Sequence, residues 1–111
     1  MIRDPLVYIR HALDAINEIE AYANGTPTIE GFIRDNKTHD AVIMQLMIVG
    51  ESLRNLPKDF LILHSELDTS GPIGLRNVLV HEYFEVSLKT VWALIEKDLP
   101  RLKLDLQKCL L

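Results

Sequence analysis

Cysteine is almost absent from this sequence, because Cys109 is the single residue of its type among 111 residues. One thiol can form neither a disulfide within the chain nor the cysteine pair that many zinc sites use. A long apolar run is also lacking near the N-terminus, where Arg3, Asp4 and Arg10 interrupt it. A signal peptide or a membrane span needs such a run. We therefore expect a cytoplasmic protein that no membrane segment anchors.

Positive charge is scarce as well, with 12 Lys and Arg against 16 Asp and Glu and a formal net charge of −4. A surface that holds nucleic acid through many phosphate contacts is basic, so any such contact in this protein must be local. Common site patterns are missing too: the sequence has no Walker loop, no G-x-G-x-x-G and no H-E-x-x-H, and its four histidines are scattered. We expect neither a metal nor a cofactor.

Apolar residues are abundant at 48%, with 25% charged residues, which is a globular composition. The length predicts a single domain over residues 1–111. Asp4-Pro5 is typical of a helix start, and apolar residues recur at helical spacing after it. We predict helices from Pro5 up to Gly25, from Ile29 to Asp35, from a cap at 36–38 to Leu56, from 70–72 to about Lys97, and, after an interruption at 98–100, through Leu102 and Leu106 to Cys109 or Leu110.

The stretch 57–69 is ambiguous, because the apolar run 60–63 lies between turn-like residues. It fits a short helix or a packed loop, and a strand there would lack a partner. The predicted fold class is therefore all-α: an up-and-down bundle of four main helices plus short helices.

The predicted helix ending at Leu56 has two adjacent apolar stripes. The first consists of Val42, Leu46, Val49, Leu53 and Leu56, and the second of Ile43, Met47 and Gly50. Together they give a face too wide for one neighbour in so small a domain, and the glycine would allow a close backbone approach. We interpret the second stripe as a dimer surface.

One segment places chemically capable side chains on an otherwise apolar helix, with Arg76, Asn77, His81 and Tyr83 inside residues 74–83. At roughly 100° per residue, Arg76 and Tyr83 lie nearly on one line, and Asn77 and His81 are neighbours four residues apart. Arg76 and His81 lie about 140° apart and border one broad face. A purely structural alternative is a hydrogen bond between Asn77 and His81, an ion pair of Arg76 with Glu82 or another acid, and a half-buried Tyr83.

The wider pattern resembles the HepT-like branch of the HEPN (higher eukaryotes and prokaryotes nucleotide-binding) domain family. The resemblance runs from about residue 4 to residue 106. It is carried by Gly74, Arg76-Asn77, Leu79, His81, Tyr83, Trp92 and Asp98-Leu99-Pro100-Arg101-Leu102, and upstream by Ala41-Val42 and Val49-Gly50-Glu51-Ser52. Family members often carry a tryptophan and a proline shortly before the glycine of the motif, where this sequence has Thr69-Ser70-Gly71-Pro72-Ile73.

The resemblance implies a homodimeric, metal-independent endoribonuclease toxin of a type VII-like HepT/MntA toxin–antitoxin system. Its R-x4-H-x-Y motif makes Arg76 and His81 the catalytic pair, with Asn77 in support. RNA supplies its own nucleophile, the 2′-hydroxyl, so the protein has only to move protons and stabilise charge. An imidazole can move the protons near neutral pH, and a guanidinium can grip two phosphate oxygens.

The resemblance also implies a partner, an MntA-type nucleotidyltransferase antitoxin that silences the toxin by adding AMP to the motif tyrosine, here Tyr83. Transfer RNA is one candidate substrate. The alternative is a non-catalytic HEPN subunit that binds a nucleotidyltransferase or a nucleotide, which the low positive charge favours. A third possibility is a purely structural helical dimerisation module.

Overall fold

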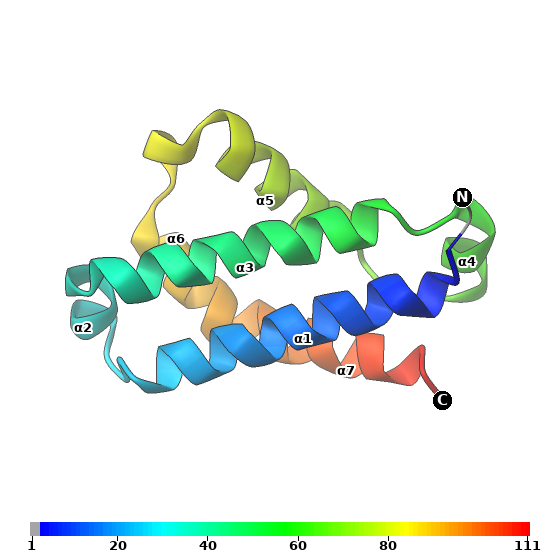
Figure 1. The fold of residues 1–111 in the computed structure, drawn as a ribbon, viewed down its shortest axis with the longest axis horizontal. Coiled ribbons are helices and arrows are strands. Elements are labelled where there is room, and N and C mark those ends of the chain that lie inside the picture. Colours follow the sequence, from blue (N-terminus) through cyan, green and yellow to red (C-terminus); the bar gives the residue numbers. More distant parts are fainter. Residues whose placement is uncertain (1–2) are drawn as a thin grey trace.

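The computed structural model describes residues 3–111, and every regular element in that range is helical (Figure 1). The elements are α1 (Pro5–Asn24), α2 (Ile29–Arg34), α3 (Asn36–Arg54), α4 (Lys58–Leu63), α5 (Ser70–His81), a 3-10 turn η1 (Tyr83–Glu85), α6 (Leu88–Ala93), a π turn η2 (Leu94–Asp98) and α7 (Leu99–Lys108). The predicted all-α class is confirmed, and the ambiguous stretch 57–69 contains the short helix α4. None of the helices in this range combines the length and apolarity that crossing a membrane requires.

Two aspartates fix the starts of the longest helices. Asp4 accepts a hydrogen bond from the Leu6 backbone N–H at 3.0 Å, with Pro5 in the first turn of α1. Asp35 caps α3 by accepting from the backbone N–H of Thr38 at 3.0 Å and from its hydroxyl at 2.8 Å. These two hydrogen bonds stabilise the carboxylate and lower the pKa of Asp35.

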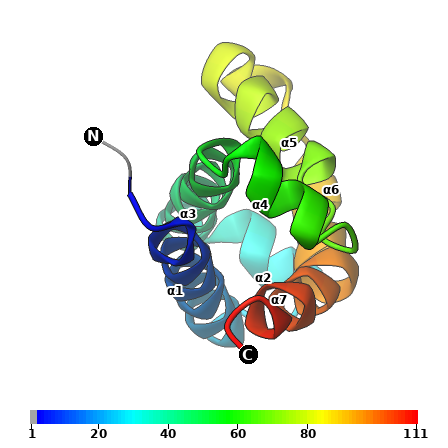
Figure 2. The same cartoon turned by 90° about the vertical axis from the view of Figure 1, so that its right-hand side faces the viewer.

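One hydrophobic core holds the bundle together. Helices α1 and α3 lie antiparallel along its length, α7 packs on α1, and α5 lies on the outer side of α3 (Figures 1 and 2). Both central helices bury a continuous apolar face, because their apolar residues recur every three or four positions. The largest fully buried side chains are Phe32, Ile9, Ile16, Ile19, Leu53, Leu79, Leu106, Val42, Val49 and Val91.

The predicted long helix from 70 to about 97 is wrong, because α5 ends at His81. Glu82 leaves the helical region with φ −137° and ψ 44°, and only three residues of 3-10 helix follow it. The chain there contains Tyr83, Phe84 and the β-branched Val86, which are modest helix formers, and none of the residues of η1 is buried. Ser87 then starts α6 by accepting a hydrogen bond from the Thr90 N–H at 3.4 Å.

The predicted interruption at 98–100 is also wrong. Leu94 and Leu99 both keep right-handed helical dihedral angles, so α6, η2 and α7 follow one another without leaving the helical region. Pro100 has no N–H to donate to the preceding turn. The widened π turn η2 ends at Asp98, two residues before Pro100, and lets the helix continue around this missing donor.

The second apolar stripe of α3 does not form a free surface, so our assignment of it to a dimer interface is wrong. Ile43 and Gly50 are both buried within the chain. A Cβ atom on Gly50 would lie 2.3 Å from the Arg76 Cβ and 2.7 Å from the Pro72 carbonyl oxygen. The close approach that a glycine permits is therefore made to α5 of the same chain.

Candidate active site

Helix α5 carries three of the four predicted site residues, and the packing of α5 against α3 positions them. Leu79 is its one buried residue, with 2% of its surface exposed, and anchors α5 to the core. Arg76 lies on the face toward α3, above Gly50, whereas Asn77 and His81 are exposed. His81 is the last residue of the helix and is therefore open to a ligand.

The guanidinium of Arg76 is held by two oxygens. One terminal nitrogen, Nη2, lies 3.1 Å from the Glu51 Oε2 of α3, and the other, Nη1, donates to the Asn77 Oδ1 at 3.0 Å. The Arg76 side chain is 20% exposed, so it is partly withdrawn from water. A guanidinium has five N–H donors in a fixed plane, and these two contacts leave others for an incoming phosphate.

The Asn77 side chain accepts a hydrogen bond from Arg76 and does not contact His81 through one. Within residues 3–111 no hydrogen bond joins Asn77 to His81, and no hydrogen bond or ion pair joins Arg76 to His81. The structural alternative gave Arg76 an ion pair with Glu82 or another acid, and the acid that pairs with it is Glu51. The sequence places Glu51 in the Val49-Gly50-Glu51-Ser52 segment but does not show that α5 crosses α3 at this glycine.

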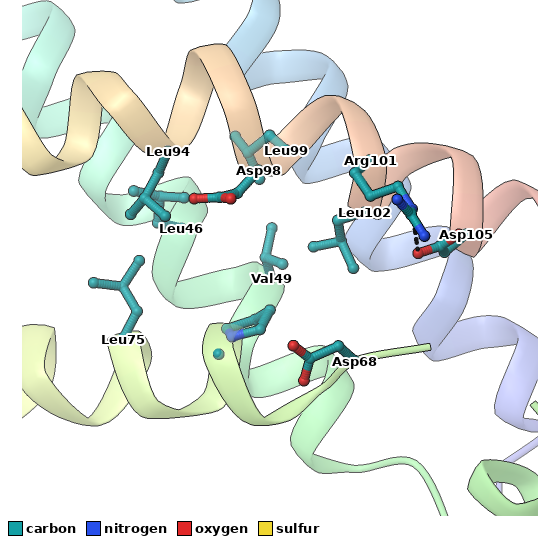
Figure 3. A pocket seen from close by; sticks show the side chains of 12 residues that line it. Leu46, Val49, Asp68, Leu75, Leu94, Asp98, Leu99, Arg101, Leu102 and Asp105 are labelled. Atoms are coloured by element: carbon teal, nitrogen blue, oxygen red, sulfur yellow. Dashed lines mark ion pairs between the residues drawn. The ribbon is translucent and has the colours of Figure 1, made fainter. Parts of the chain in front are cut away.

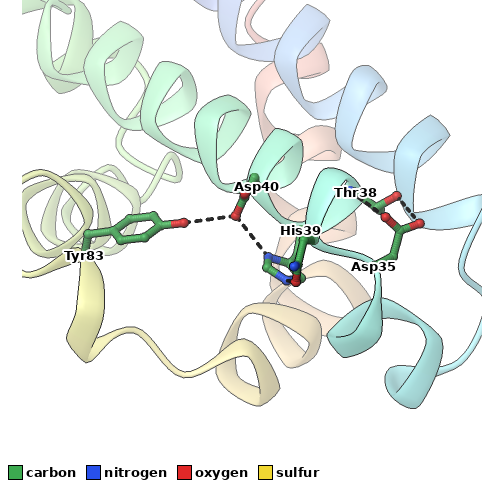
Figure 4. A network of polar contacts seen from close by, with 6 residues as sticks. Asp35, Thr38, His39, Asp40 and Tyr83 are labelled. Atoms are coloured by element: carbon green, nitrogen blue, oxygen red, sulfur yellow. Dashed lines mark hydrogen bonds and ion pairs between the residues drawn. The ribbon is translucent and has the colours of Figure 1, made fainter.

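Tyr83 lies off the helix, so its predicted alignment with Arg76 along one helical line is wrong. Its hydroxyl donates to the Asp40 Oδ1 at 3.0 Å, across to the start of α3 (Figure 4). The same Asp40 oxygen lies 3.2 Å from the Nδ1 of His39, an ion-pair distance without hydrogen-bond geometry. The hydrogen bond to Asp40, together with partial desolvation and the carboxylate's charge, raises the pKa of Tyr83.

His81 opens onto a shallow hollow of about 540 Å³ that is also lined by Glu82, Tyr83, Phe84 and Glu85. Two carboxylates therefore flank the imidazole and the phenol. Phe84 is 97% exposed, and sequence reasoning did not single it out. The only feature of the sequence that could have indicated Phe84 is its position as an aromatic residue next to the motif tyrosine.

A second cavity of about 370 Å³ lies between α3, α5 and the segment from η2 to α7 (Figure 3). Five leucines and Val49 form much of its wall, and its polar lining residues are Asp68, Asp98 and the pair Arg101 and Asp105. None of the predicted site residues lines this cavity. Within residues 3–111, no three His, Cys, Asp or Glu side chains gather as metal ligands would.

Comparison with known proteins points to one family. The family model described as "Ribonuclease HepT-like" matches residues 12–109. The chain is 36% identical over 101 residues to "Probable ribonuclease HepT" of Thermococcus cleftensis, covering 91% of each protein. It is 31% identical over 109 residues to a "Putative RNase" of Caldanaerobacter subterraneus subsp. tengcongensis, covering 98% of this chain and 96% of the relative.

A longer relative also matches. The chain is 32% identical over 108 residues to "Gamma-glutamylcyclotransferase and putative RNase" of Methanocaldococcus jannaschii, and the match covers 97% of this chain but spans only 48% of that protein. The comparison with solved structures found no significant match.

The all-helical bundle and these relatives define the class as RNA-cleaving enzymes of the HEPN type. The chain belongs to the HepT-like ribonuclease family.

Proposed function

We propose that this protein is a metal-independent endoribonuclease toxin, the toxic half of a type VII-like HepT/MntA toxin–antitoxin pair that acts in the cytoplasm. The observation that carries the proposal is that α5 carries both a fixed cation, Arg76, and an exposed imidazole, His81. Family membership supports the same reading, and the charged groups suit transesterification of RNA. Transfer RNA is one candidate substrate.

In the proposed reaction the 2′-oxygen of RNA attacks the adjacent phosphorus and the bond from phosphorus to the 5′-oxygen breaks. A base takes the 2′ proton and an acid gives a proton to the leaving 5′-oxygen. His81 carries out one of these transfers. Arg76 binds the phosphate oxygens through the N–H groups that Glu51 and Asn77 leave free, and stabilises the charge that develops there.

One imidazole cannot easily act as base and acid in the same step, so we infer a homodimer in which a second copy of the motif supplies the other role. The second stripe of α3 does not fit that role, because Ile43 and Gly50 are buried within the chain and Met47 packs partly against its core. Helix α5 offers other apolar surface, because Val78 and Val80, on the two flanks of the buried Leu79, are about half exposed.

Incubation of the wild-type protein with an RNA pool in EDTA tests the proposed chemistry. We expect cleavage to continue and to leave 2′,3′-cyclic phosphate and 5′-hydroxyl ends, because the nucleophile is internal and no metal is required. The 5′-hydroxyl ends would accept a labelled phosphate from a polynucleotide kinase without prior phosphatase treatment. Cleavage that stops in EDTA would refute the metal-independent mechanism.

The alternative is a non-catalytic subunit that binds a nucleotidyltransferase or a nucleotide. Glu82 and Glu85 favour its protein-binding form, because their charges repel the phosphates of RNA or of a nucleotide from the His81 hollow. If the wild-type protein cuts no RNA in the pool but co-purifies with a nucleotidyltransferase, this alternative replaces the nuclease.

Tyr83 is the proposed site of AMP addition by the antitoxin. Its oxygen would attack the α-phosphorus of ATP, pyrophosphate would leave, and the phenolic proton would pass to a base. Asp40 accepts the hydrogen bond from that hydroxyl and is placed to take the proton. AMP attached here would fill the hollow that His81 shares and add a negative charge to it.

Tyr83→Phe is expected to abolish AMP addition and to retain RNA cleavage, since the phenol takes no part in the proposed cleavage step. Mass spectrometry after incubation with the nucleotidyltransferase and ATP should show one added AMP on the wild type and none on the variant.

Asp40→Asn should slow the modification and lower the pKa of Tyr83 toward its ordinary value. The second effect is visible in a phenolate absorbance titration with Tyr83→Phe as the reference, and an unchanged pKa would speak against this role of Asp40.

A further inference from the structure

Phe84 is the most exposed aromatic side chain beside the proposed site. It is 97% exposed on the 3-10 turn η1, and it lines the same hollow as His81. A bare aromatic ring leaves a large apolar surface in water. A ring in this position is available to a ligand that reaches His81.

The Phe84 ring is supported rather than free-standing. It meets the Tyr83 ring edge to face, with centroids 5.6 Å apart and planes at 84°. Tyr83 in turn is fastened to α3 through its hydrogen bond to Asp40 (Figure 4). The aromatic pair, Tyr83 and Phe84, is therefore held against the bundle by a hydrogen bond between residues that lie 43 positions apart in the sequence.

The negative charges around the aromatic pair favour contact with the bases of an RNA strand over contact with its phosphates. Glu82 and Glu85 line the same hollow and repel phosphate groups. A nucleobase is uncharged and presents two flat π faces, which stack on aromatic side chains. Arg76, on the side of α5 that faces α3, is left to hold the phosphate.

We propose that Phe84 stacks on an unpaired base of the RNA substrate next to His81, so that the enzyme acts on single-stranded RNA. A base inside a duplex has both faces covered by its neighbours and cannot reach the ring. The inference rests on the proposed ribonuclease function and names the substrate class of that site. It also explains how a chain with a net charge of −4 can bind RNA, because stacking takes the place of many phosphate contacts.

The test is RNA binding by full-length protein carrying His81→Ala, which prevents cleavage during the measurement. A labelled RNA oligonucleotide of mixed sequence is used single-stranded or annealed to its complement, and Kd is read from fluorescence anisotropy. Adding Phe84→Ala should raise the Kd for the single strand about ten-fold and leave the Kd for the duplex unchanged. Phe84→Trp, which keeps a π face, should bind as tightly as Phe84.

Ile62→Ala is the matched control, because Ile62 is an exposed apolar residue on α4, 75% exposed and outside the hollow. It should leave both Kd values unchanged. An unchanged Kd for the single strand in Phe84→Ala, or an equal loss for both RNAs, would overturn the proposal.

Two other outcomes are equally decisive. A lower sedimentation mass of Phe84→Ala with unchanged RNA affinity would assign Phe84 to an interface between copies of this chain and overturn the proposal. If the wild type cuts no RNA but Phe84→Ala still loses single-strand affinity selectively, the stacking site stands and the nuclease function fails.

Discussion

His81→Ala is expected to reduce RNA cleavage by about 10²- to 10⁴-fold, the usual contribution of a general acid or base. The imidazole is exposed at the end of α5 and makes no hydrogen bond within residues 3–111 that its loss would break. The fold should therefore survive, with an unchanged helical circular dichroism spectrum and melting temperature. Single-turnover cleavage of a labelled RNA is the measurement.

The matched control for this experiment is His11→Ala, which removes an exposed histidine from α1 far along the sequence from the motif. It should cleave RNA at the wild-type rate. If His81→Ala retains full cleavage in a correctly folded protein, His81 is not the proton-transfer group and the proposed mechanism is wrong.

Gly50→Ala is expected to destabilise the protein and to impair cleavage together. The new Cβ would lie 2.3 Å from the Arg76 Cβ and 2.7 Å from the Pro72 carbonyl oxygen, so α5 must move away from α3. Overpacking of this kind costs about 1–3 kcal/mol of unfolding free energy. The movement also pulls Arg76 away from Glu51, which fixes its guanidinium. Urea unfolding and cleavage kinetics measure the two effects.

Gly74→Ala on α5 provides the matched control, because a Cβ there meets nothing within 4 Å. Alanine is the better helix former, so this variant should be more stable by about 0.5–1 kcal/mol. It should cleave RNA normally. Equal stability of Gly50→Ala and the wild type would mean that α5 does not lie on α3 as described.

Local signals predicted most of the fold. The cap at Asp4 with Pro5 set the start of α1, and the repeat of apolar residues along α1 and α3 identified their buried faces. The break after His81 was missed because no glycine or proline marks it, and Ser87 gives only a weak cap signal. The continuity at Pro100 was missed because a π turn has no recognisable sequence signature.

The contacts among the proposed site residues could be predicted from the sequence only in part. Residues close together in sequence, such as Arg76 and His81, were visible as a motif. Glu51, the partner of Arg76, and Asp40, the partner of Tyr83, both belong to α3, and only the packing of α5 and the break after it bring them near. The width of the apolar face on α3 was read correctly, but periodicity cannot tell whether a helix of the same chain or a second subunit covers such a face.

The uneven burial of the helices separates the residues that hold the fold from those proposed for chemistry. Helix α1 buries seven residues and α3 buries seven, whereas α5 buries only Leu79 among its twelve. Substitutions at exposed positions usually change stability by less than about 0.5 kcal/mol. The exposed positions of α5 can therefore vary through evolution with little risk to folding. A lineage could change its RNA preference, or lose cleavage and keep the bundle as a binding subunit, without first acquiring compensating mutations in the core.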